Sequence, residues 1–266
     1  MNISRIYAIF IRQLFLVKSN PTRLASIFLW IIISVIQWGF ITKYLGAFGQ
    51  ATFSFVNVVL GAVILWEFTN RVEYGIMTTF LEDIWSNNFI NIFASPLKIK
   101  EYISGMVLTS IATAAIGFLI MISIAGLGFG YDIFKVGILL LPFIFILFLF
   151  GVALGIFAST LIFRLGPAAE WLVWPIPIVL SIFCGVFYPI ATLPYSLQVV
   201  AKLIPASYVF EGARSILSSN AFPISNLFIG GLLAIIYLLL AYRLFISVYR
   251  RNLKNGGIAR FSAEGF

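Results

Sequence analysis

Several apolar runs in this chain are longer than the roughly 18 residues that a helix needs to cross the hydrocarbon core of a bilayer. Hydrophobic residues make up 62% of the 266 residues and charged residues only 10%, whereas soluble domains carry roughly 25% charged residues. The runs are continuous and do not alternate between apolar and polar residues, which disfavours a β-barrel. The sequence therefore predicts an all-α integral membrane protein.

Six of these runs are predicted to be transmembrane helices. The first two are separated only by residues 46–50, a turn too short for a domain, so they are expected to form a helical hairpin. The predicted spans are 25–45, 51–68, 103–127, 136–162, 171–188 and 224–246.

The positions of the basic residues predict the orientation, because cytoplasmic loops are enriched in Lys and Arg. With the N-terminus inside, only Lys43, Lys135, Lys202 and Arg214 fall outside. The cytoplasmic set is Arg5, Arg12, Lys18, Arg23, Arg71, Lys98, Lys100, Arg164, Arg243, Arg250, Arg251, Lys254 and Arg260. We expect a multi-pass protein of a bacterial or archaeal cytoplasmic membrane, with both termini in the cytoplasm and no signal peptide in residues 1–20. The net charge of +8 then reflects this topology and contact with membrane lipids, not nucleic acid.

The residue inventory argues against a catalytic centre. Cys184 is the single cysteine and histidine is absent, which excludes disulfide frameworks and disfavours zinc and haem sites. The predicted span interiors hold almost no ionisable residues, so an ion-coupled transport mechanism lacks its usual groups. No Gly-rich phosphate loop ending in Lys-Ser/Thr occurs, so energy for any pumping must come from another polypeptide.

The segment 3–17 is predicted to be an amphipathic helix in the cytoplasmic interface. Its apolar residues recur at helical spacing, and it is too short and too charged to cross the bilayer. Arg5, Arg12 and Gln13 are expected to point away from the apolar face. A simple membrane anchor is an equally good interpretation.

A cytoplasmic stretch is expected between spans two and three, at about 69–101. In it, Glu82 and Asp83 are predicted to open a short amphipathic helix at its positive dipole end. Ser95-Pro96 marks a break, since the residue before proline resists helical geometry. The apolar stripe of this helix, 82–93, needs a partner, which is the membrane surface, the protein's own helices or a soluble subunit.

Two further segments lie between spans. The turn 163–170 carries Arg164 and Glu170, as a second docking contact or as a plain solvated loop. On the outer side, Pro194 and Pro205 are each placed to begin a short helix. Two such helices, within 195–217, are too short to span and are expected to dip into the outer leaflet or cap the bundle. Glu211 and Arg214 have the i, i+3 spacing of an ion pair.

This layout resembles the permeases of the ABC-2 transporter family over nearly the whole chain. Phe93-Ala94-Ser95-Pro96-Leu97 before the third span resembles the entry that follows the family's coupling helix. The outer segment resembles the family's signature through Tyr188-Pro189, Leu193-Pro194, Pro205, Tyr208, Glu211 and Arg214.

The resemblance implies roles for named residues. Arg164 and Glu170 would be a second cytoplasmic contact. The contacts with an ATPase would come from Glu82, Asp83, Ile84, Trp85, Ser86, Asn87, Asn88, Phe89, Ile92 and Phe93, with Trp85 and Phe89 as the hydrophobic insert. The outer-helix gate would comprise Tyr188, Pro189, Pro205, Tyr208, Glu211 and Arg214.

The resemblance also implies partners and an activity. Two permease chains, as a homodimer, would work with two ABC-type ATP-binding subunits that hold ATP and Mg, and this chain would hold no cofactor. Spans one, two and five would line the path, and Trp171, Trp174, Pro175 and Pro177 would allow a distorted fifth span. The cargo would be amphipathic or lipid-like, slightly favoured over a polysaccharide. The alternative is a non-transporting scaffold or assembly factor; an intramembrane enzyme lacks converging catalytic groups.

Overall fold

The computed structural model describes residues 1–19, 21–48, 53–86, 88–131, 137–219 and 222–255. These residues form helices and no strand, so the predicted all-α class is confirmed. The helices are α1 (Ile3–Ser19), α2 (Pro21–Phe48), α3 (Phe53–Trp85), α4 (Phe89–Ala94), α5 (Ile99–Phe129), α6 (Gly137–Leu165), α7 (Glu170–Val173), α8 (Pro175–Phe183), α9 (Tyr195–Ala201), α10 (Pro205–Ser219) and α11 (Ile224–Lys254), with 3-10 turns at Pro167–Ala169 and Ile190–Thr192.

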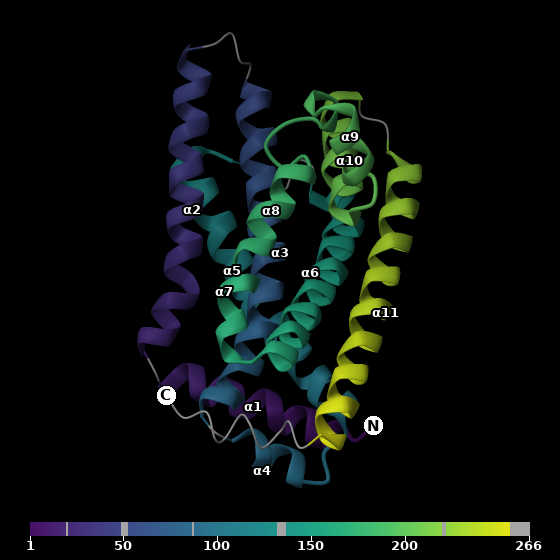
Figure 1. Ribbon diagram of the computed structural model, residues 1–266. Helices are drawn as coiled ribbons and strands as arrows, with labels where there is room; N and C mark the ends of the chain where they lie inside the picture. Colours follow the sequence, from purple (N-terminus) through teal and green to yellow (C-terminus); the bar gives the residue numbers. More distant parts are fainter. Residues whose placement is uncertain (20, 49–52, 87, 132–136, 220–221, 256–266) are drawn as a thin grey trace.

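The long helices α2, α3, α5, α6 and α11 stand side by side as an upright bundle (Figure 1). Helix α1 lies across the lower end of this bundle with α4 below it, and α9 and α10 lie at the upper end. The N-terminus and the end of α11 are both at the lower end. In the predicted topology this lower end is the cytoplasmic one, and we call it the base.

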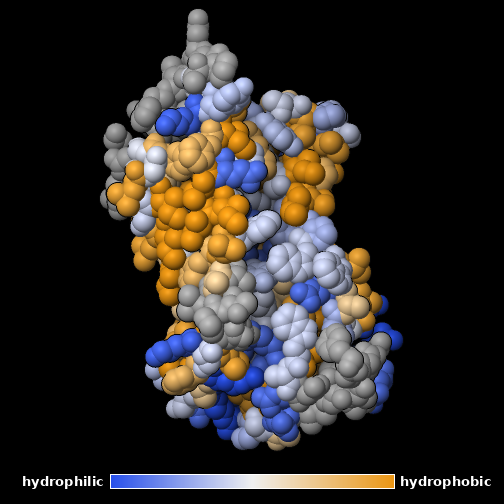
Figure 2. Space-filling view, turned by 90° about the vertical axis from the view of Figure 1, so that its left-hand side faces the viewer, coloured by the Kyte–Doolittle hydropathy of each residue, from blue (hydrophilic) through white to orange (hydrophobic). Residues whose placement is uncertain are grey.

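Four helices within the described ranges are long and apolar enough to cross a membrane: α2 over Phe28–Gly46, α5, α6 over Leu139–Leu165, and α11. They coincide with predicted spans one, three, four and six, although Val136 lies outside the described residues. Figure 2 shows apolar side chains gathered over the upper part of one face and hydrophilic ones at the base. The count of six spans stays a prediction.

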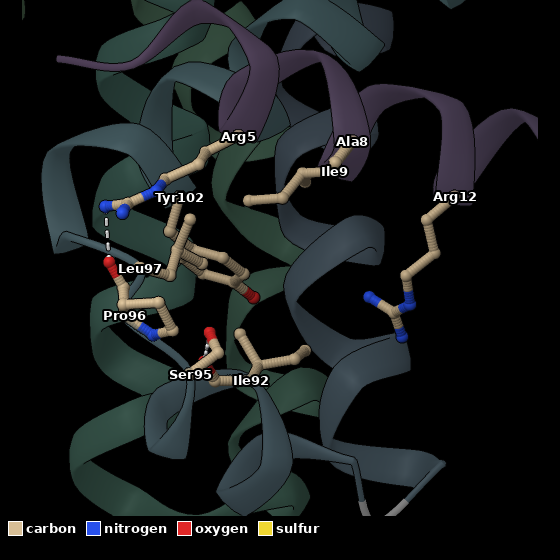
Figure 3. A pocket seen from close by; sticks show the side chains of 9 residues that line it. All are labelled: Arg5, Ala8, Ile9, Arg12, Ile92, Ser95, Pro96, Leu97 and Tyr102. Carbon is tan, nitrogen blue, oxygen red and sulfur yellow. Dashed lines mark hydrogen bonds between the residues drawn. The ribbon is translucent and has the colours of Figure 1, made fainter.

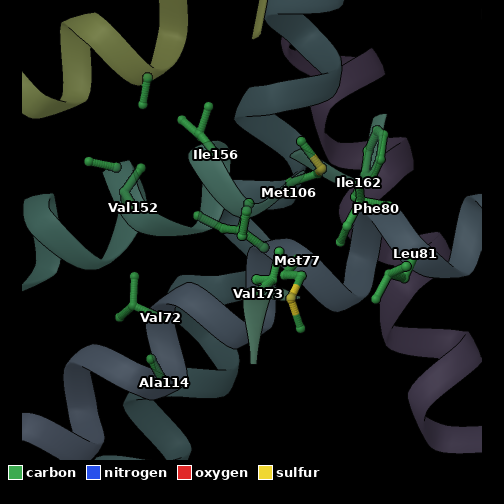
Figure 4. Close-up of a cluster of buried hydrophobic side chains, with 14 of the residues drawn as sticks. Val72, Met77, Phe80, Leu81, Met106, Ala114, Val152, Ile156, Ile162 and Val173 are labelled. Carbon is green, nitrogen blue, oxygen red and sulfur yellow. The ribbon is translucent and has the colours of Figure 1, made fainter. Parts of the chain in front are cut away.

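Helix α3 continues past the predicted end of span two, from residue 68 to Trp85. The extension keeps an apolar face at i, i+4 spacing, with Val72, Ile76 and Phe80 all fully buried. This face packs against α5 and α6, so much of the predicted cytoplasmic stretch 69–101 belongs to the bundle (Figure 4). The charged residues between these apolar positions hide the helix from a search for uncharged runs.

Predicted span five, 171–188, comprises two short helices in place of one continuous helix. Helix α7 ends at Val173, α8 begins at Pro175, and α8 ends at Phe183. The expected distortion near Trp174 and Pro175 is therefore present, because proline has no N–H to donate to the preceding turn. The chain then turns at Gly185, whose φ of 70° lies in the left-handed region that favours glycine.

Two glycines allow α6 to approach α3 closely. A Cβ atom at Gly151 would stand 2.9 Å from the carbonyl oxygen of Thr69, and one at Gly155 would stand 2.9 Å from the carbonyl oxygen of Glu73. Glycines four residues apart lie on one face of a helix, and such pairs let helix backbones meet inside membranes. The contact between α3 and α6 therefore depends on the absence of side chains at these positions.

We expect Gly155→Ala to destabilise the bundle by about 1–3 kcal/mol, because overpacking a tight contact forces the backbones apart. The measurement is the thermal unfolding midpoint of the purified chain in detergent. Gly128→Ala is the matched control, since no atom lies within 4 Å of its added Cβ. Equal midpoints for the two variants would show that the α3–α6 contact is not tight.

Candidate functional site

Two buried carboxylates hold α1 across the base. Asp83, at the end of α3, forms an ion pair with Arg12 and accepts a 2.7 Å hydrogen bond from the Tyr102 hydroxyl. Glu101, at the start of α5, accepts hydrogen bonds from the backbone N–H of Asn2 at 2.7 Å and from Arg5 at 3.4 Å. Helices α1, α3 and α5 are thereby joined into one unit at the base.

The face that α1 presents to the bundle includes the polar residues that are expected to point away. Its polar residues Arg5, Arg12 and Gln13 were predicted to point away, yet the two arginines pair with α5 and α3 and Gln13 is buried. Ile3 and Tyr7 are exposed instead. The reason is that the buried carboxylates of the bundle need cationic partners, and α1 supplies them.

The predicted coupling helix 82–93 is not a single helix. Glu82, Asp83, Ile84 and Trp85 form the last turn of α3, at its negative dipole end, and helix structure resumes only at Phe89. Asp83 and Ile84 are buried in the bundle at the end of α3, and Phe89 is buried again at the start of α4. The chain therefore changes direction between the two helices. Ser86 and Asn88 suit this break because their side chains compete for backbone hydrogen bonds; Asn87 lies outside the described residues.

Phe89 packs inside the protein and is not available as an insert for a partner. It is 1% exposed, and its ring centroid lies 5.5 Å from that of Phe80 and 5.3 Å from that of Phe163. Phe245 completes this aromatic cluster, 5.9 Å from Phe80. Of the three partners considered for the apolar stripe, Phe89 therefore contacts the protein's own helices.

Trp85 differs from Phe89, since it remains 46% exposed. Ile92 is half-buried, and the Phe93 side chain lies outside the described part of the structure. We call a set of exposed residues in the segment 85–100 the base surface: Trp85, Ser86, Asn91, Ser95, Pro96, Lys98 and Lys100. This surface combines one large apolar side chain with two lysines, one amide and two hydroxyl groups. Of these residue types, only the aromatic one is enriched at protein interfaces, so Trp85 is the residue that suits contact with a soluble protein.

A cavity of about 320 Å³ lies beside the base surface, between α1, α4 and the start of α5 (Figure 3). Ile9, Ile92 and Leu97 contribute apolar walls, and Arg5 and Arg12 border it. Both arginines are already engaged by carboxylates. The cavity is therefore suited to an apolar side chain more than to an anion.

The turn after α6 carries the predicted second contact. Arg164 is exposed, and Glu170 accepts a 3.2 Å hydrogen bond from Nε1 of Trp174. The two charges do not pair with each other within the described residues. The turn is held from α11, because the Asn252 side chain donates a 2.9 Å hydrogen bond to the carbonyl of Phe163.

At the upper end, the expected Glu211–Arg214 pair is present at 3.0 Å. Arg214 also donates to the carbonyls of Gly185 and Tyr188, and Glu211 accepts a 2.8 Å bond from the N–H of Ile190. Burial lowers the pKa of Arg214 from its ordinary value, and Glu211 opposes that shift. The pair therefore holds the turn after α8 against α10.

The other predicted gate residues take positions in the same region. Pro189 precedes the 3-10 turn Ile190–Thr192, and Pro205 opens α10. The Tyr188 hydroxyl donates a 2.6 Å hydrogen bond to the carbonyl of Ile182, and the Tyr208 hydroxyl donates a 2.9 Å one to the carbonyl of Lys202. These residues stabilise local turns; whether they gate anything stays a prediction.

Sequence reasoning missed the charges that α3 carries within the bundle. Arg71 and Glu73 are buried, and Glu67 accepts a 2.7 Å hydrogen bond from Ser34 on α2. The i, i+4 spacing of Val72 and Ile76 could have predicted these charges inside the bundle, because it indicates that the helix continues past the predicted end of span two.

Comparison with known families gives one match. The sequence model of the family described as "ABC-2 type transporter" matches residues 4–218, which run from α1 to the end of α10. No curated protein matches the chain at a level that marks a relative.

We expect Arg12→Gln to loosen α1, because it removes the cationic partner of the buried Asp83 carboxylate. Breaking a buried pair in this way costs about 3 kcal/mol. A double-mutant cycle with Asp83→Asn, measured by thermal unfolding in detergent, should show that the two changes are strongly non-additive. Strict additivity would contradict the coupling of α1 to α3 through this pair.

We expect Phe89→Ala to destabilise the chain by about 3–5 kcal/mol, since it opens a cavity in the aromatic cluster. Trp85→Ala is the matched comparison, because it removes an aromatic ring four residues away that is half exposed. Its effect on the unfolding midpoint should be small. A larger loss for Trp85→Ala than for Phe89→Ala would reverse the assignment of core and surface.

Proposed function

The chain belongs to the ABC-2 type transporter family, and from this premise we propose that it is the permease subunit of an ATP-driven exporter. It moves an amphipathic or lipid-like molecule, such as a drug, a lipid or a lipid-linked glycan, outward across the cytoplasmic membrane. A separate ABC-type subunit binds ATP and Mg²⁺ and supplies the energy. This chain contributes the membrane path and the surface on which that subunit acts.

The observation that carries the proposal is the rigid base. Asp83 and Glu101 join α1 to α3 and α5, so a displacement of the base surface moves two long helices together. Coupling of nucleotide binding to a membrane path requires such a rigid connection, because a flexible loop would absorb the displacement. Trp85, exposed beside this connection, is the anchor that we assign to the contact with the ATP-binding subunit.

We propose that two copies of the chain assemble around the transport path. Large apolar side chains are exposed on α2 and on α7–α8, among them Trp30, Phe40, Trp171 and Ile178. Figure 2 looks onto the side of the molecule on which α2 lies in Figure 1, and it shows a patch of apolar side chains there. In a dimer, part of it would be covered by the second copy and part by lipid.

We expect Trp85→Arg to abolish co-purification of an ATP-hydrolysing subunit with the chain, because a charged side chain replaces the apolar anchor. The measurement is pull-down of the tagged chain from native membranes, followed by ATPase assay and identification of a Walker-motif protein in the eluate.

Leu253→Arg is the matched control, since Leu253 is also a half-exposed apolar residue near the base, at the end of α11. It should leave association unchanged. Equal ATPase recovery with both variants would remove Trp85 from the contact. Absence of any ATPase partner with the wild-type chain would favour a non-transporting scaffold.

A further inference from the structure

A narrow polar groove runs along α3 from the base into the bundle. It encloses about 120 Å³ between α1, α3 and α5. Arg71, Thr78, Glu82 and Trp85 line it at helical spacing on α3, and Gln13 and Thr113 face it from α1 and α5. The groove is separate from the cavity beside α4, because the two have no lining residue in common.

The groove extends into the bundle as far as Thr113 on α5, and the stem of Arg71 continues beyond it. On α5, Ile9 of α1 packs at Gly105, whereas the Cγ atom of Arg71 lies 3.6 Å from where a Cβ at Gly117 would stand. The twelve residues between these glycines correspond to about 18 Å of helix. Helix α5 carries no charged residue after Glu101, so Arg71 lies against the middle of its uncharged length.

Arg71 and Gln13 both keep unused donors there. Arg71 is 5% exposed, its Nε has no hydrogen-bond partner, and no carboxylate of the described residues lies within 4.0 Å of the guanidinium. The ring of Tyr74 lies 5.5 Å from its Cζ. Gln13 is 1% exposed, and its Nε2 likewise has no partner. A buried cation without a counter-ion is costly in an apolar surrounding, and such residues mark binding sites.

The other groups define what the groove can accept. The hydroxyls of Thr78 and Thr113 already donate to carbonyls of their own helices, at 2.8 and 3.1 Å, so their oxygens are left as acceptors. Glu82 lies eleven residues from Arg71, about 16 Å along α3, and does not neutralise the guanidinium. An occupant therefore needs negative charge at the inner end and can use hydroxyl donors along the way.

We infer that this groove binds the anionic headgroup, phosphate or carboxylate, of an amphiphile that enters from the base. Arg71 binds the charge, Gln13 donates an amide hydrogen, and the threonine oxygens accept from hydroxyls of the headgroup. A volume of about 120 Å³ holds a headgroup only, so the hydrocarbon chain remains outside. The site belongs to this chain alone, and its test needs no ATP-binding subunit, so its failure is distinguishable from failure of the proposed export.

The test is a thermal-unfolding titration of the full chain in dodecyl maltoside. The probes are dodecyl phosphate, the neutral dodecyl glycerol ether, and inorganic phosphate. We expect a saturable rise of the midpoint with dodecyl phosphate only, because ligands that bind the native state stabilise it. Arg71→Gln should weaken this binding at least about tenfold, as expected for the loss of a charge-assisted contact.

Arg250→Gln is the matched control, since it removes the same charge from an exposed position on α11 and should bind as the wild type does. If Arg71→Gln fails to fold, Arg71→Lys should retain binding and Gln13→Leu should weaken it. Equal binding by wild type and Arg71→Gln, or by Arg71→Lys and Gln13→Leu, overturns the site. An equal rise with the neutral ether overturns the anionic specificity, and an equal rise with inorganic phosphate overturns the assignment to an amphiphile.

Discussion

The buried carboxylate of Asp83 is the group on which the organisation of the base depends. It sits at the end of a 33-residue helix, fully removed from solvent, and so requires a cation and a hydrogen-bond donor. Arg12 and Tyr102 meet that requirement from two other helices. One charged group thereby determines that α1 lies against the bundle with Arg12 inward, on the same side as the buried Ile9 and Gln13.

The length of α3 follows from the same packing. A helix that ended at residue 68 would leave the apolar face of Val72, Ile76 and Phe80 without neighbours. Continuing to Trp85 buries that face against α5 and α6, and it also carries Arg71 and Glu73 into the interior. The polar groove beside α3 is a consequence of this extension. Helix α3 therefore both packs in the core of the bundle and lines the site that we infer for an anionic headgroup.

At the upper end, an arginine also joins separate segments, but its partners are mainly backbone carbonyls. Arg214 joins α10 to the turn that follows α8, through backbone carbonyls and through Glu211. An exposed pair of this spacing contributes little, but multiple bonds to backbone give this arginine a structural role. The short outer helices are thereby attached to the end of the broken fifth segment.

Much of this could be predicted from residue types alone. Helix class and four apolar helices follow from long uncharged runs, since a helix satisfies its own backbone in lipid and the runs lack the alternation of a β-barrel. The break at Trp174 and the Glu211–Arg214 pair follow from proline chemistry and helical spacing. These are local properties, determined within a few residues along the chain.

Tertiary packing decided the rest. Glu82 and Asp83 resemble the start of a helix, and only the approach of α1 and α5 makes them the end of one. Phe89 and Trp85 are both aromatic residues of one predicted stripe, and the contact with Phe80 and Phe163 buries one and leaves the other exposed. The sequence by itself determined which segments are helical and apolar. Which face of each helix is buried, and which charges are neutralised, depends on neighbours up to 99 residues away along the chain, because burial is a property of the assembled bundle.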